Sequence, residues 1–148
     1  MNTMQENRAV LIAVFIMVAF NGLYLSGNGL LMLVAPMVWY ESVPSVTDTG
    51  FFNQHFIRDI GLIFLFLGTA FLVGAARPQY RIVLWAAPTL WLWGHALFHF
   101  WEVAVGICGP SAIARDFPAV TLPAILGTIL TLWAVANARA ERAVPART

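Results

Sequence analysis

The chain carries little charge and no lysine. Only 10% of its 148 residues are charged, whereas a soluble domain typically has about 25%, and all eight basic residues are arginine. The formal net charge of +1 excludes nucleic-acid binding by bulk positive charge. Long apolar runs are separated by short polar breaks, and no polar stretch is long enough to form a soluble domain. We therefore expect a single integral membrane domain over residues 1–148.

Cysteine is almost absent as well, since Cys108 is the only one. A single thiol excludes an intrachain disulfide, a CxxC redox centre and a CxxCH haem attachment. Three interpretations of Cys108 stay open. It is an inert buried thiol, which is the commoner case, a soft ligand that favours copper, or the partner in an intermolecular disulfide.

Four apolar runs cover most of the chain, at about 9–35, 52–76, 82–107 and 118–138. Each exceeds the roughly 20 residues needed to cross ~30 Å of hydrocarbon. No small-x-small cleavage site follows the first run, so we interpret it as a transmembrane helix rather than a signal peptide. The sequence predicts an all-α fold, an antiparallel four-helix bundle in the membrane.

The arginines predict its orientation. Most of them lie at the N-terminus, in the second connection and at the C-terminus, namely Arg8, Arg77, Arg81, Arg139, Arg142 and Arg147. The positive-inside rule then places both termini in the cytoplasm and turns connections 37–51 and 108–117 outward. The first of these mixes aromatic and acidic residues. It is expected to be either a lid over the mouth of the bundle or a plain interfacial connector.

Small residues mark one face of the first run. Gly22, Ser26 and Gly29 form a stripe at helical spacing, beside the polar residues Asn21, Tyr24 and Asn28. Small residues let two helices approach closely, and amides hydrogen-bond between them. We interpret both groups as packing features, with cavity lining as the alternative for the polar ones.

Ionisable residues inside the second and third runs are the functional signal. His95, His99 and Glu102 follow i, i+4, i+7 spacing, and His55 and Asp59 are four residues apart. Antiparallel pairing of the two runs brings all five within roughly 10 Å of depth, in the outer half of the membrane. Such residues are costly in hydrocarbon, so their matched depth predicts a functional site.

Three imidazoles and two carboxylates suit a transition metal, with copper or zinc expected and the redox or hydrolytic role unassigned. A b-type haem between His55 and His95 or His99 is a weaker alternative, because bulky aromatic residues flank the histidines. A structural polar network in an accessory subunit of a larger membrane complex, or in a homo-oligomer, is the rival from another class. A proton relay fits less well, because no polar path continues to the cytoplasmic side.

Two segments carry a recognisable pattern, which consists of Pro36, Trp39-Tyr40, Val43-Pro44, Thr49-Gly50, Asn53, His55-Phe56, Arg58-Asp59-Ile60-Gly61, and then His95, Phe98-His99 and Trp101-Glu102. This pattern resembles small bacterial four-helix membrane proteins of the DoxX-like and DUF4345 types. The resemblance implies a bundle in a bacterial inner membrane and no particular reaction.

A looser similarity exists to membrane hydrolases of the ceramidase and adiponectin-receptor type, which bind zinc between helices. It maps their zinc chemistry onto His55, Asp59, His95 and His99, and implies hydrolysis of a lipid amide or ester by zinc-activated water. Those proteins have seven spans, whereas four are expected here.

Overall fold

A computed structural model of the protein describes residues 2–143, which fold into helices without any strand. The long helices are α1 (Asn2–Val34), α4 (Gln54–Ala76), α5 (Arg81–Ala104) and α7 (Leu122–Ala143). Shorter elements connect them: α2 (Pro36–Ser42), α3 (Val46–Thr49), the 3₁₀ turn η1 (Pro78–Tyr80), α6 (Ser111–Asp116) and the π-helical turn η2 (Phe117–Thr121). The predicted all-α class is confirmed.

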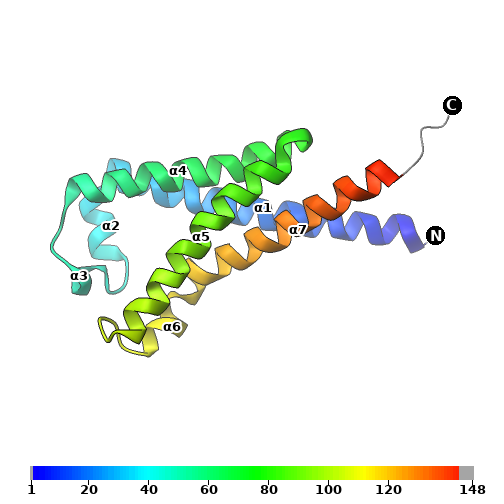
Figure 1. Cartoon of the computed structure of the whole chain (residues 1–148). Coiled ribbons are helices and arrows are strands. Elements are labelled where there is room, and N and C mark those ends of the chain that lie inside the picture. Colours follow the sequence, from blue (N-terminus) through cyan, green and yellow to red (C-terminus); the bar gives the residue numbers. More distant parts are fainter. Residues whose placement is uncertain (1, 144–148) are drawn as a thin grey trace.

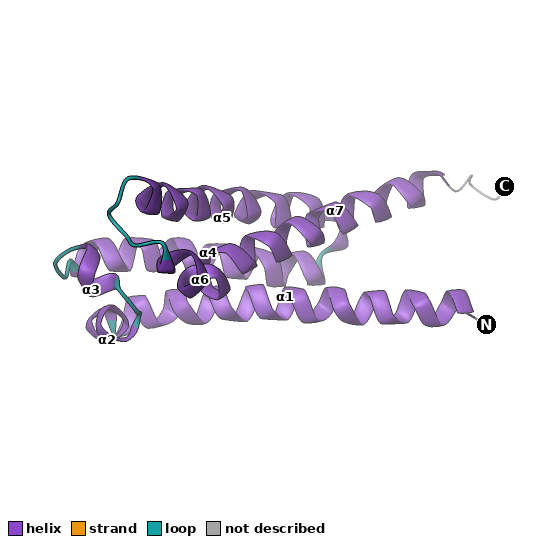
Figure 2. Cartoon of the chain, turned by 90° about the horizontal axis from the view of Figure 1, so that it is seen from below, coloured by secondary structure: helices purple, strands orange, loops and turns teal. Residues whose placement is uncertain are grey.

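The long helices form two pairs that cross obliquely (Figure 1). α1 runs beside α4, and α5 runs beside α7. α4 and α5 meet at η1 and diverge toward the opposite end, where α2, α3 and α6 lie (Figures 1 and 2). The two connections that were predicted to face outward therefore share one end of the molecule.

Within the described residues, three helices are long and apolar enough to cross a membrane: Arg8–Val34, Gln54–Ala76 and Ser111–Arg142. The predicted third span is also a long helix, α5, but its arginine, proline, glycine and histidines lower its hydropathy. The outer surfaces are apolar, as contact with a bilayer requires, through side chains such as Phe15, Ile16, Leu23, Phe66 and Leu132. The count of four spans and their orientation stay predictions.

The closest packing joins α1 to α4 through glycine. A Cβ added to Gly29 would lie 2.6 Å from both the Gly61 carbonyl oxygen and the Leu65 amide nitrogen. Seven residues after Gly61 on α4, Gly68 faces Ser26 and the carbonyl of Gly22. The two backbones thus touch without intervening side chains, as small-residue stripes allow. The predicted packing role of the stripe on α1 is confirmed.

Polar groups on α1 also fix α7 where prolines interrupt its backbone ladder. Pro123 has no N–H to donate to the carbonyl of Ala119, and the Tyr24 hydroxyl lies 3.4 Å from that oxygen. The fully buried Asn21 side chain donates to the carbonyl of Pro123 at 3.0 Å. These two bonds therefore join α1 to η2 and to the first turn of α7, beside Pro123.

Arg81 closes the turn between α4 and α5. Its guanidinium donates to the carbonyls of Gly74 and Ala75 at 3.2 and 3.4 Å, at the C-terminal end of α4. It also lies over the rings of Trp85 and Trp133, at 5.2 and 5.3 Å. α4 and α5 are held together at this end, so any space between them opens at the other.

We expect Gly29→Ala to destabilise the protein and Gly27→Ala to leave it unchanged or slightly more stable. The new methyl at position 29 meets backbone atoms, which costs about 1–3 kcal/mol, whereas nothing lies within 4 Å at position 27. Thermal unfolding in detergent, followed by circular dichroism, measures both. Equal melting temperatures for the two variants would contradict the glycine contact.

Candidate binding cleft

A cleft of about 700 Å³ lies where α4 and α5 diverge. Its walls come from α1, α4, α5 and α6, and the connection containing α2 and α3 covers it. Aromatic side chains line much of it, including Trp39, Tyr40, Phe56, Phe64, Trp91 and Phe98, and its polar lining includes Asn28, His95, His99, Glu102, Arg115 and Asp116. The cleft is therefore apolar along its length with a polar group of residues at one end.

The two histidines of α5 lie next to each other in this cleft. Their ring centroids are 4.7 Å apart and the rings are nearly perpendicular. The His95 ring stacks on the Trp91 ring, with the ring centroids 5.1 Å apart. It is perpendicular to the Phe64 ring, whose centroid lies 6.2 Å away. His95 is thus held among aromatic rings, while His99 is one turn closer to the polar end.

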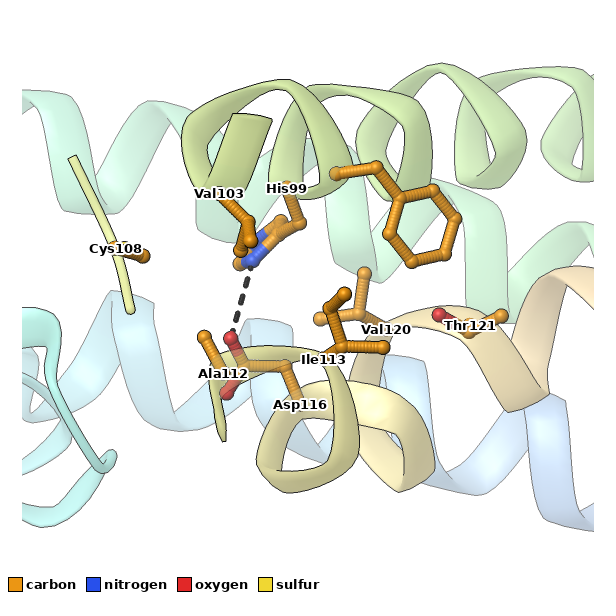
Figure 3. A pocket seen from close by; sticks show the side chains of 9 residues that line it. His99, Val103, Cys108, Ala112, Ile113, Asp116, Val120 and Thr121 are labelled. Carbon is orange, nitrogen blue, oxygen red and sulfur yellow. Dashed lines mark ion pairs between the residues drawn. The ribbon is translucent and has the colours of Figure 1, made fainter. Parts of the chain in front are cut away.

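His99 is positioned by a carboxylate from another element. Its Nδ1 lies 3.4 Å from Oδ2 of Asp116 at the end of α6 (Figure 3). Glu102 Oε2 is 4.0 Å from the same nitrogen. A small void of about 10 Å³, large enough for about one water molecule, adjoins this pair beside Cys108 and Ala112. An imidazole oriented by a carboxylate can accept or donate a proton.

Arg115 connects this pair to the cover of the cleft. It forms a forked ion pair with Asp116, at 2.7 and 3.0 Å, and donates to the hydroxyl of Ser45. Ser45 precedes α3 and has a left-handed backbone, with φ of 66°. A continuous chain of polar contacts thus runs from the connection between α1 and α4 through α6 to His99 on α5.

Two further hydrogen bonds hold the cover in place. The Trp39 indole donates to Oδ1 of Asn28 at 2.6 Å, and the Tyr40 hydroxyl donates to the carbonyl of Gly50 at 2.7 Å. Most residues between Trp39 and Gly50 line the cleft, with Glu41, Thr47 and Asp48 as exceptions. The interpretation of the connection as a lid is confirmed, and Asn28 takes the cavity-lining role that sequence left as its alternative.

The expected five-residue layer does not form. His55 and Asp59 pair with each other at 3.2 Å, but their side chains are 89% and 56% exposed and neither lines the cleft. The cause is the rotation of α4. Gly61 must face α1, and at 100° per residue Asp59 lies ~160° and His55 ~120° away from it. Phe56 and Ile60 occupy the face that was expected to carry the pair.

The consequence for a metal centre is direct. Among residues 8–142, whose side chains are described, no three His, Cys, Asp or Glu side chains are grouped so that they could hold a metal ion. Cys108 is a free thiol at the edge of the cleft. The structure does not bring together the five predicted ligands, His55, Asp59, His95, His99 and Glu102. Copper, zinc and haem binding stay predictions.

Two residues of the cleft, Arg115 and Asp116, were not among the site residues predicted from the sequence. The feature of the sequence that could have indicated them is the short connection 108–117. It must fold back over the end of α5, so its residues reach the level of His99.

Comparisons with family models, curated proteins and solved structures found no match for this chain. The geometry of the cleft is thus what bears on function.

We expect Arg115→Ala to loosen the lid without unfolding the helices. The substitution removes the contact with Ser45, while the packing of α1 on α4 is unaffected. Hydrogen–deuterium exchange over residues 43–50 should become faster, with unchanged exchange in α1 and α4. Arg77→Ala, at the opposite end of the protein, is the control, and an unchanged lid in Arg115→Ala would contradict the contact.

Proposed function

We propose that the protein binds an amphipathic small molecule in the cleft between α4 and α5. The cleft of about 700 Å³ is the observation that carries this, because its size and its mixture of aromatic walls with few polar groups are typical of ligand sites. The apolar part of the ligand lies among Phe64, Trp91 and Phe98. Its polar part meets His99 and Glu102.

The ligand enters from the membrane, between the two helices. Phe56 on α4 and Phe98 on α5 line the cleft, yet they are 61% and 51% exposed. These side chains form the rim of a lateral opening. The lid covers the end of the cleft, so the side between α4 and α5 is the remaining approach supported by exposed apolar residues.

The proposed orientation of the helices determines which half of the bilayer contains the cleft. We propose that α5 is a fourth span, beside the three apolar helices, and that both termini are cytoplasmic, as the arginine distribution favours. The cleft then lies in the outer half of the bilayer. If the membrane is a bacterial inner membrane, this is the periplasmic side.

Metal binding is the second candidate, and fewer observations support it. The adjacent pair His95 and His99 favours it, because i, i+4 histidines on a helix can present two nitrogens to one ion. Glu102 is the nearest further group on the same helix, and an external ligand would have to complete the coordination. An accessory role in a larger membrane complex, or a homo-oligomer, rests on the apolar outer surfaces alone.

Filling the cleft tests the leading proposal. We expect Ile60→Trp to reduce the amphiphile that remains bound through purification, because Ile60 lines the cleft. Leu90→Trp adds the same indole on the outside of α5, where the leucine is 77% exposed, and should change nothing. Native mass spectrometry from detergent, with lipid extraction, measures retained amphiphile. Equal retention in both variants would place binding outside the cleft.

Metal analysis separates the two candidates. We expect no stoichiometric copper or zinc after purification without chelators, because the described side chains contain no group of three ligands. Elemental analysis and the visible spectrum measure this. Stoichiometric metal that is lost in His95→Ala and His99→Ala would instead establish metal binding, and a Soret band would establish haem.

A further inference from the structure

Three strong hydrogen-bond donors of the cleft, from Trp39, Tyr40 and Arg115, are already engaged within the protein. The Trp39 indole donates to Asn28, and the Tyr40 hydroxyl donates to Gly50. The charge of Arg115 is paired with Asp116 through two of its nitrogens. A ligand headgroup that needs strong donors, such as a phosphate, finds the one arginine fork of the cleft occupied.

The Glu102 carboxylate, in contrast, is an acceptor available to a ligand. The Glu102 side chain is 12% exposed and lines the cleft, and its closest cationic partner, His99 Nδ1, is 4.0 Å away. That nitrogen lies nearer to Asp116, at 3.4 Å. Within residues 8–142 no hydrogen bond reaches the Glu102 carboxylate, which is costly for a largely buried charge. Asp116 is already paired with Arg115, so Glu102 is the acidic group of the cleft to which a cationic ligand can bind.

We infer that the headgroup bound here is a protonated amine carried on an apolar chain, which rests on the proposed function. Its N–H groups donate to the Glu102 carboxylate, and its charge compensates that of the cleft. Aromatic rings such as those of Tyr40 and Phe98 line the same space and favour a cation. A headgroup with a net negative charge and no amine would place its charge against this carboxylate, so it is disfavoured.

The length of the cleft suits an apolar chain attached to that amine. Glu102 lies in the last turns of α5, and Trp91 lies eleven residues earlier, which corresponds to ~16 Å along the helix. Phe64, His95 and Phe98 line the interval. The polar end lies toward the outer connections and the apolar end toward the middle of the bundle, which matches a molecule oriented in the outer leaflet.

Two sources supply such a ligand, an aminophospholipid of the bilayer and a free long-chain amine. The test uses the full chain in detergent and native mass spectrometry titrations at neutral pH. The lipid probes are phosphatidylethanolamine, its N-acetyl derivative and phosphatidylglycerol, and the free probes are dodecylamine and dodecanol. We expect binding to be about tenfold tighter for the amine than for its matched neutral or anionic partner. A larger preference among the lipid probes identifies the aminophospholipid as the source, and a larger preference among the free probes identifies the long-chain amine.

Glu102→Gln should remove that preference, because it keeps the shape of the side chain and loses its charge. The matched control is Glu41→Gln, which changes an exposed carboxylate on α2 outside the cleft and should retain the preference. If Glu102→Gln does not fold, the comparison of amine with N-acetyl amine on the unmodified protein decides the inference by itself.

The outcomes distinguish this inference from the function on which it rests. Binding of amphiphiles with no preference for the amine, or a preference that Glu102→Gln retains, would overturn the headgroup assignment and leave the cleft as a binding site. No retention of any probe, together with equal results for Ile60→Trp and Leu90→Trp, would overturn the proposed function itself.

Discussion

The contact of α1 with α4 is the constraint on which the rest of the structure depends. Where Gly29 meets Gly61, the backbones touch, so α4 can neither move away from α1 nor rotate about its own axis without a clash. This fixed rotation decides which side chains of α4 face the interior. Phe56, Ile60 and Phe64 line the cleft because Gly61 and Gly68 are committed to α1.

The cleft exists because the helix pairs are tied at one end and free to diverge at the other. Arg81 holds the turn between α4 and α5 against the tryptophans of the interior, and Asn21 and Tyr24 hold α7 against α1. At the divergent end, side chains cannot span the widening gap. The space is covered by the lid and its polar contacts instead of being filled by a packed core.

The sequence predicted the positions of the helices along the chain well and their rotation poorly. Hydropathy located the helices, and spacing placed His95, His99 and Glu102 on one face, which does line the cleft. His55 and Asp59 were matched to them in depth, but depth says nothing about azimuth. Gly61 and Gly68 carried that information, and pairing them with Gly22 and Gly29 would have turned His55 and Asp59 outward. Asp116 depends on how a short loop folds back, which periodicity does not encode.

The bond between Arg115 and Ser45 has a consequence for biosynthesis. Its partners are 70 residues apart in the chain. At translation rates of about 5–20 residues per second, the arginine follows the serine out of the ribosome by several seconds. α1 and α4 can associate within that interval, since both precede α5. The lid can therefore be secured only after α5 has been synthesised, and the newly inserted protein passes through a stage in which the cleft is uncovered to the surrounding lipid.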